Sequence, residues 1–239
     1  MKRIKDIIIS FFIYLIEYLN FLVWGIILII LSFFHTGKFF EFLLTRFCRT
    51  ILFIGGVRVK IEGINNIDDK KQYILMMNHV NLFDAFVLNG SYPGKVRGIE
   101  EESHMRWPFY GWLMTRIGMI PISRKNARDA LGSLKKAAEI LKKQKNFSVA
   151  ILPEGTRTMT GKLGNFKRGG FLLAQESGLE ILPVVQVGSY EIKKKKRWIV
   201  RPGKIKLVFE KPISTTGFTK ENIRDLMDDV RKVFLKYVD

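Results

Sequence analysis

The chain has 239 residues, and 47% of them are hydrophobic, which is enough to bury one sizeable core. Its 40 lysines and arginines against 22 aspartates and glutamates give a formal charge of +18, which favours nucleic acid, an anionic membrane or an acidic protein as partner. No helix-turn-helix, zinc-finger or RNA-recognition pattern occurs and the amino terminus is strongly apolar, so we expect a membrane bilayer and no nucleic acid. One cysteine and three scattered histidines predict no disulfide, no metal site and no cofactor, as in a reducing cytoplasm.

The first segment, residues 7–34, is overwhelmingly apolar, although Glu17 and Asn20 interrupt it. Its longest part without a charged side chain, 18–34, is about 25 Å long as a helix, whereas the hydrocarbon core of a bilayer is about 30 Å thick. Basic residues stand on both sides of the segment, so a single span would place one basic group on the wrong side of the membrane. We therefore favour a hairpin that dips into one leaflet, with a single span as the alternative.

A second helix is predicted over residues 38–54. At 100° per residue most of its apolar side chains share one face and its charged side chains share the other, which is typical of a helix in the lipid headgroup layer. A core helix of the soluble part is the alternative. We expect 1–54 to be a membrane-anchoring two-helix segment and 55–239 to be one α/β domain, on the cytoplasmic face of the cell membrane.

From residue 55 onward, strand-like apolar runs alternate with helical patterns, which predicts an α/β fold with a mainly parallel sheet flanked by helices. In such sheets, ligands bind beyond the carboxyl ends of the strands, so polar residues that follow a strand are the first candidates for a site. Strands are expected near 72–78, 96–99, 119–122, 147–152, 181–187, 198–201 and 204–209.

The most informative polar residues, His79 and Asp84, follow the first of these runs. A carboxylate that reaches one imidazole nitrogen fixes the tautomer and leaves the other nitrogen free as a base. The spacing therefore predicts a proton-abstracting pair, although polar residues in a plain strand-to-helix turn would have the same spacing.

Later segments continue this pattern. Residues 118–124 form a short strand that ends in Arg124, and the strand at 147–152 runs into Pro-Glu-Gly-Thr-Arg-Thr at 153–158. Phe-Lys-Arg-Gly at 166–169 and Ile-Leu-Pro-Val at 181–184 follow. Four blocks in this order, namely 78–84 with His79 and Asp84, 118–124, 153–157 and 181–184, resemble the glycerolipid acyltransferase family with the H-x-x-x-x-D motif, most closely its 1-acyl-glycerol-3-phosphate acyltransferases.

This resemblance implies transfer of a fatty acyl group from acyl-CoA or acyl-carrier protein to the sn-2 hydroxyl of 1-acyl-glycerol-3-phosphate (lysophosphatidic acid), which gives phosphatidic acid. It also implies the same α/β architecture. His79 is then the base that takes the hydroxyl proton, and Asp84 orients and supports the imidazolium. No serine or cysteine nucleophile is required, and Cys48 lies in the amino-terminal helices, away from the strand ends.

The resemblance also implies substrate-binding residues. Arg124 and Arg157 match the family's arginines, and guanidinium groups suit phosphate oxygens. Glu154 is expected to pair with one of these arginines or to bind a headgroup hydroxyl. Gly155 lets the chain approach the substrate without a Cβ, and Thr156 is a hydroxyl donor.

The sequence departs from the family in one place. Where a lysine associated with acceptor binding is usual, residues 97–102 read Arg-Gly-Ile-Glu-Glu-Glu, so that Glu100 and Glu101 take its region. Arg97 and Arg106 are candidates to supply the missing charge. The acceptor could otherwise be another lysolipid or glycerol-3-phosphate, and a non-catalytic lipid-binding protein on the same fold is a further alternative. The basic run at 193–198 is interpreted as solvated surface, with contact to lipid headgroups as its alternative.

Overall fold

The structure is a computed structural model that describes residues 2–34, 37–108, 110–123 and 125–238. In these residues, seven strands form one sheet in the order β1-β7-β6-β2-β5-β3-β4. All neighbouring strands are parallel except β6 and β7. The strands are β1 (Val57–Glu62), β2 (Tyr73–Met77), β3 (Val96–Glu101), β4 (Ile120–Ile122), β5 (Ser148–Ile151), β6 (Glu180–Val187) and β7 (Gly203–Phe209).

The central strand β2 explains why the sheet needs cover on both faces. All five of its residues are buried, and successive side chains point to opposite faces. Tyr73, Leu75 and Met77 therefore enter one hydrophobic core, while Ile74 and Met76 enter the other. A continuous apolar run of this kind is stable only between two layers of helices.

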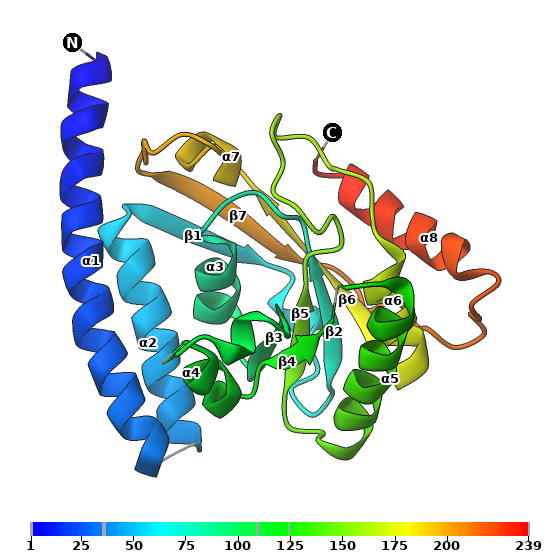
Figure 1. Ribbon diagram of the computed structural model, residues 1–239. Helices are drawn as coiled ribbons and strands as arrows, with labels where there is room; N and C mark the ends of the chain where they lie inside the picture. The colour runs from blue at the N-terminus through cyan, green and yellow to red at the C-terminus, as the bar shows by residue number, and fades with distance from the viewer. Residues whose placement is uncertain (1, 35–36, 109, 124, 239) are drawn as a thin grey trace.

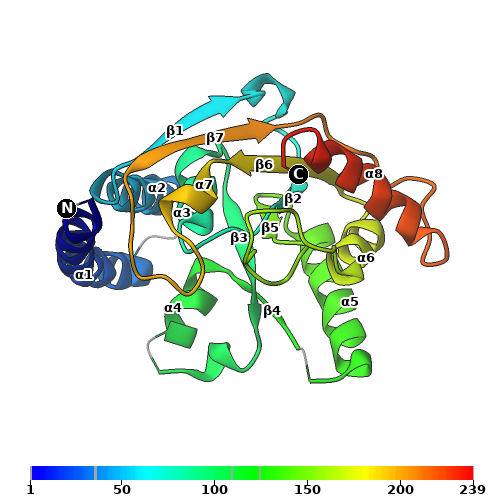
Figure 2. The same ribbon diagram turned by 90° about the horizontal axis from the view of Figure 1, so that it is seen from above.

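Helices supply these two layers (Figures 1 and 2). One core is shared with α1 (Lys2–Phe34), α2 (Lys38–Ile54) and α3 (Asp84–Ser91). The other is shared with α5 (Ala127–Lys143), α6 (Arg168–Ser177) and α8 (Ile223–Leu235). The shorter elements are η1 (Ile64–Asn66), η2 (His104–Arg106), α4 (Tyr110–Ile117) and α7 (Ser189–Ile192). The predicted α/β fold with a mainly parallel, helix-flanked sheet is confirmed.

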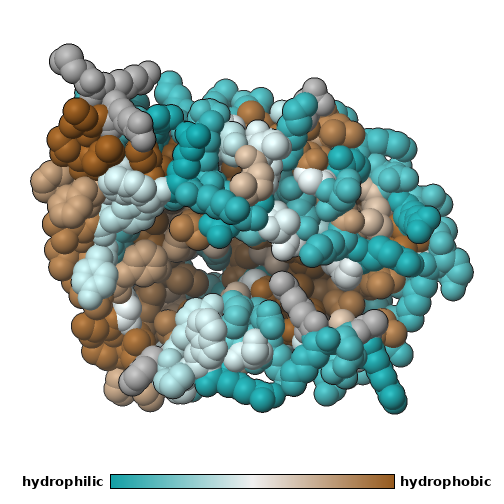
Figure 3. Space-filling model, turned by 45° about the horizontal axis from the view of Figure 1, so that its top comes forward, coloured by the Kyte–Doolittle hydropathy of each residue, from teal (hydrophilic) through white to brown (hydrophobic). Residues whose placement is uncertain are grey.

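Helices α1 and α2 lie side by side at one edge of the molecule (Figures 1 and 2). Between Ile4 and Phe34, α1 is long and apolar enough to cross a membrane, by length and composition, and it is the one such helix in the described part of the chain. Its inner face packs on the protein, with Ile13 and Leu28 in the core. Its outer face exposes many large apolar side chains, which form the brown area at the α1 side of Figure 3.

Two strand assignments from the sequence are wrong. The structure contains β1, which was not expected. Its apolar residues alternate with charged ones, as in a strand at the edge of a sheet, and do not form the continuous apolar run of a central strand. The strand expected at 198–201 is absent, because this segment pairs with a helix. The Val200 N–H donates to Ser10 Oγ at 3.0 Å, and Ser10 Oγ lies 3.2 Å from the Val200 carbonyl.

Candidate active site

The expected contact between His79 and Asp84 is present in the turn that leads from β2 to α3. His79 Nδ1 lies 2.7 Å from Asp84 Oδ2. The side chain of Asp84 is 2% exposed and that of His79 is 22% exposed, so the carboxylate is buried while the imidazole reaches the surface. Because the carboxylate is the acceptor, Nδ1 carries the hydrogen and Nε2 is left with a free lone pair. The pair has the geometry of a general base.

The carboxylate of Asp84 is held by more than the histidine. Its Oδ2 accepts from the Val80 N–H at 2.7 Å, and its Oδ1 accepts from the Asn81 N–H at 3.0 Å. Oδ1 also accepts from Gln186 Nε2 at 2.8 Å. These contacts fix both oxygens, so the imidazole is oriented by a group that is itself immobile.

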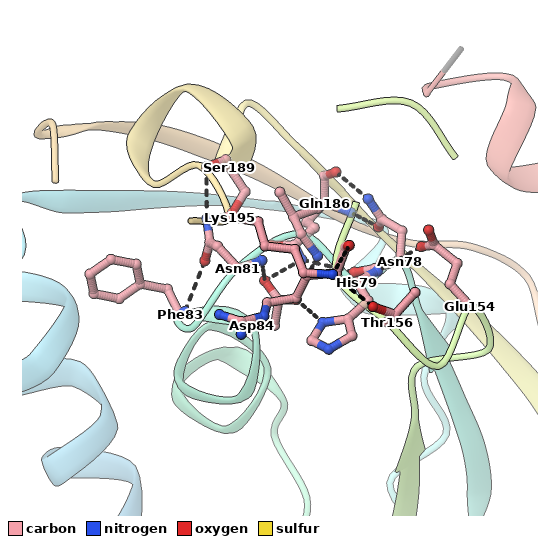
Figure 4. A network of polar contacts seen from close by, with 12 residues as sticks. Asn78, His79, Asn81, Phe83, Asp84, Glu154, Thr156, Gln186, Ser189 and Lys195 are labelled. Carbon is pink, nitrogen blue, oxygen red and sulfur yellow. Dashed lines mark hydrogen bonds and ion pairs between the residues drawn. The ribbon is translucent and has the colours of Figure 1, made fainter. Parts of the chain in front are cut away.

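Gln186, on β6, is a site residue that the sequence reasoning missed. It is 1% exposed, and it joins β6 to the end of β2 through Asn78 (Figure 4). The Gln186 N–H donates to Asn78 Oδ1 at 2.9 Å, and Asn78 Nδ2 donates to the Gln186 carbonyl at 3.0 Å. The one available signal was a polar residue inside an otherwise apolar strand.

Glu154 connects the loop after β5 to the turn that carries His79 and Asp84. Its Oε1 accepts from the His79 N–H at 2.8 Å, and its Oε2 accepts from the Gly164 N–H at 2.8 Å. Burial raises the pKa of Glu154, although both amide hydrogen bonds favour the carboxylate. The expected ion pair with an arginine does not occur among the described residues. Both oxygens are used to hold the loop.

Residues of this loop from Glu154 onward line a groove near the turn that carries His79. Gly155 has φ +66°, which L-residues rarely adopt, and a Cβ there would lie 2.9 Å from Lys167 Cδ. The hydroxyl of Thr156 accepts from Lys195 Nζ at 2.8 Å, and the Arg157 carbonyl accepts from the same ammonium at 3.1 Å (Figure 4). The groove holds about 420 Å³, and its lining includes Glu154, Thr156, Arg157, Lys162 and Lys195.

Comparison with known proteins shows the family to which the chain belongs. A family model described as "Acyltransferase" matches residues 58–187, which is more than half of the chain. The chain belongs to the acyltransferase family. It is 32% identical over 186 residues to the 1-acyl-sn-glycerol-3-phosphate acyltransferase of Limnanthes douglasii, covering 78% of this chain and 65% of the relative. It is 34% identical over 178 residues to the enzyme of that name from Saccharomyces cerevisiae, covering 74% and 58%.

A solved structure extends the comparison to nearly the whole chain. The crystal structure of the 1-acyl-sn-glycerophosphate acyltransferase from Thermotoga maritima matches with a TM-score of 0.81 and 26% identity, covering 98% of this chain and 95% of that one. The curated relatives above are longer, and the chain spans 58% to 65% of their length. The acyltransferase fold therefore includes the amino-terminal helices as well as the sheet.

A cysteine thiol and a metal centre are two further kinds of reactive group that enzymes use. Cys48 is buried in α2, and burial raises its pKa to about 12, so that almost no thiolate exists at neutral pH. No group of three or more His, Cys, Asp or Glu side chains that could hold a metal ion occurs in the residues that the structure describes.

The sequence offered three further arginines for the acceptor. Arg124 lies outside the described residues. Arg97 is buried and forms an ion pair with Glu41 on α2, in which Nη1 lies 3.1 Å from Oε2. The exposed Arg106 lies 3.4 Å from Glu102. Arg97 and Arg106 thus already have acidic partners.

Glu100, in the acidic segment of β3, bonds to a histidine and a tyrosine. Glu100 Oε1 lies 2.7 Å from His104 Nδ1, and the Tyr110 hydroxyl donates to Oε2 at 2.8 Å. Burial acts to raise the pKa of Glu100, but these bonds and the Glu101 N–H outweigh it, so the pKa is lowered. Burial and Glu100 together raise the pKa of Tyr110 to about 12. The segment therefore carries negative charge where the family usually has a lysine.

Proposed function

We propose that the chain is a 1-acyl-sn-glycerol-3-phosphate O-acyltransferase that makes phosphatidic acid for phospholipid synthesis. The observation that carries this proposal is the His79–Asp84 contact at the carboxyl edge of the sheet, next to a groove that contains Arg157 and Lys195. The family and the names of the relatives support the same reaction.

The reaction follows from the position of the free imidazole nitrogen. His79 Nε2 takes the proton of the sn-2 hydroxyl as that oxygen attacks the thioester carbonyl carbon. Asp84 supports the imidazolium that forms. The tetrahedral intermediate then expels the thiolate, and the imidazolium returns the proton to that sulfur. The new ester is phosphatidic acid, and the free thiol leaves.

The acceptor's phosphate is assigned to the groove. Arg157 offers a planar guanidinium fork to two phosphate oxygens, Thr156 offers its hydroxyl, and Arg124 is proposed as a second phosphate ligand. Glu154 and Gly155 shape the loop that presents these groups. The donor is acyl-CoA or acyl-carrier protein, both acidic, and the +18 charge attracts either.

The anchor is proposed to lie in one leaflet, on the cytoplasmic face of the cell membrane. Near its start, α1 contacts the α/β domain through Asp6, whose Oδ2 lies 2.8 Å from Arg201 Nε. Near its end, the Phe33 and Trp112 ring centroids are 4.8 Å apart. A helix that contacts the domain at both ends leaves only its outer face for lipid, as in a monotopic protein.

Residues 1–54 and 55–239 are proposed as the anchor and the catalytic domain. Because Phe47, Ile51 and Leu52 of α2 lie in the same core as Val87 and Leu88 of α3, deletion of 1–54 should give a poorly soluble protein with little activity on bilayer substrate. Sedimentation with vesicles and an acyl-transfer assay measure both effects. A soluble truncated protein with full activity on vesicle-embedded lysolipid would contradict this coupling.

The decisive experiment supplies the purified full-length protein with radiolabelled acyl-CoA or acyl-carrier protein and one acceptor at a time. The acceptors are lysophosphatidic acid, lysophosphatidylcholine, lysophosphatidylethanolamine and glycerol-3-phosphate, and His79→Ala protein is the control. We expect labelled phosphatidic acid on thin-layer plates. The acidic segment around Glu100 favours a second candidate, an acceptor other than lysophosphatidic acid, which a different labelled product would identify. No product from any acceptor would support a lipid-binding protein instead.

A further inference from the structure

The basic run after α7 has two kinds of lysine. Lys195 donates to Thr156 and to the Arg157 carbonyl, and Lys193 is only 8% exposed. Lys194 instead lies 3.4 Å from Glu191 and 4.6 Å from the centroid of the Tyr190 ring. Lys196 is exposed. Lys195 thus lines the groove and Lys193 is buried, although the sequence favoured a solvated surface for the whole run.

The catalytic turn itself fixes the position of this segment. Asn81 Nδ2 donates to the Ser189 carbonyl at 2.8 Å and contacts Ser189 Oγ at 2.7 Å. Ser189 is the first residue of α7, and Lys193 follows directly after its last residue. The buried Asn81–Ser189 contacts, which Figure 4 shows from close by, therefore tie the start of the segment that carries the lysines to the turn that carries His79.

The charges in this region are unbalanced. Arg157, Lys193 and Lys195 form no ion pair with a carboxylate among the described residues, and the carboxylate of Glu154 is already held by two amides. Burial lowers the pKa of Lys193, and the positive charge of Arg157 lowers it further. Cations held this close in a partly buried place destabilise one another unless an anion joins them.

We propose that Lys193 and Lys195 form, together with Arg157, the subsite that binds the acceptor's phosphate. This inference rests on the proposed function, because the acceptor must carry a phosphate monoester. Two ammonium groups beside the guanidinium of Arg157 give a dianionic group more positive charge than arginine side chains alone. They also replace the lysine that the acidic segment around Glu100 lacks, since Arg97 and Arg106 are paired with acids.

The test compares Lys195→Met and Lys193→Met with Lys196→Asn as the matched control. Each substitution removes one positive charge from the same run, and asparagine suits the positive φ of 64° at position 196. With lysophosphatidic acid and acyl-CoA in mixed micelles, we expect the acceptor KM to rise about tenfold or more in both methionine variants. The donor KM should stay unchanged, and Lys196→Asn should match the wild type.

Lys193→Arg separates charge from packing at the buried position, because it keeps the cation. It should retain an acceptor KM within about threefold of the wild type, whereas loss of folding in Lys193→Met alone would show as a lower unfolding temperature. Acceptor KM values unchanged in Lys195→Met and in a folded Lys193→Met would overturn the inference. A rise in the donor KM alone would also overturn it, by assigning the lysines to the phosphates of acyl-CoA.

A second readout does not need turnover. Inorganic phosphate and glycerol-3-phosphate should raise the unfolding temperature of the wild type and of Lys196→Asn but not of Lys195→Met. If the wild type acylates no phosphorylated acceptor yet shows this stabilisation, the proposed function fails and the anion site stands. If it acylates lysophosphatidic acid but Lys195→Met is equally active and equally stabilised by phosphate, the site fails and the function stands.

Discussion

The turn that carries His79 and Asp84 differs from the adjoining groove in whether its charged side chains have partners of opposite charge or hydrogen-bond donors. In the turn, Asp84 is buried and both its oxygens are held by hydrogen bonds from the imidazole, two amides and Gln186. In the groove, Arg157 and Lys195 have no carboxylate partner among the described residues. The charge of Asp84 is thus balanced inside the protein, whereas the cations of Arg157 and Lys195 are not paired with a carboxylate among the described residues.

This difference separates two tasks that the proposed reaction needs. A general base works best when it is positioned before the substrate arrives, which the fixed Asp84 and its neighbours achieve. A group that binds an anionic ligand must have a charge that no other side chain neutralises, as an arginine without a carboxylate partner has. Substitutions in the turn should therefore act on kcat, and substitutions in the groove should act on the acceptor KM.

The largest effect is expected in the turn. His79→Ala removes the base and should lower kcat by roughly 100- to 10,000-fold, because a positioned base contributes about that much. Asp84→Asn should also cripple transfer, since an amide cannot accept from all the donors around Asp84. Acyl-transfer assays with circular dichroism as the folding control measure this. A folded His79→Ala protein with more than roughly a tenth of the wild-type rate would exclude the base role.

Arg157→Ala, which changes the groove, should have the next largest effect. Loss of the guanidinium is expected to lower kcat/KM for the phosphorylated acceptor by an amount equivalent to about 2 to 4 kcal/mol of transition-state stabilisation. Arg157→Lys should be less affected because it keeps the charge. Steady-state kinetics in which acceptor and donor are varied separately check the result. The donor KM should barely move, and a change confined to the donor would transfer Arg157 to the thioester carrier's site.

Gln186→Leu tests whether a positioning residue belongs to the turn. It removes the amide that donates to Asp84 Oδ1 and to the Asn78 carbonyl while keeping a similar volume, so we expect kcat to fall about tenfold. Both KM values should remain at wild-type level. Gln175→Leu on α6 is the control, since it also removes a glutamine amide but contacts neither residue. Equal losses in the two variants would mean that Gln186 acts only through stability.

The sequence predicted these two regions unequally, and the reason is distance along the chain. His79 and Asp84 lie five positions apart, so one turn brings them together, and the strands around them are continuous apolar runs. Gln186 and Lys195 reach the site only because β6 pairs with β2, which adjacent sequence does not reveal. Glu154 was expected to pair with an arginine or to bind a headgroup hydroxyl. Its partners among the described residues are backbone amides, which no residue type signals.

Gly155 joins the two regions, because Glu154 belongs to the paired turn and Arg157 to the groove. Gly155→Ala places a Cβ at φ +66°, which costs about 1 to 2 kcal/mol, and close to the flexible side chain of Lys167. We expect the unfolding temperature to fall by roughly 2 to 8 °C.

Because the strain shifts the groove side of the loop, the acceptor KM of Gly155→Ala should rise a few-fold while kcat stays within about twofold of the wild type. Gly217→Ala is the control for strain alone, since Gly217 has φ +85° and a Cβ there would have no atom within 4 Å. It should lose similar stability and keep the wild-type acceptor KM. If kcat of Gly155→Ala fell while its acceptor KM stayed at the wild-type value, the loop would position His79 through Glu154 and would not position Arg157.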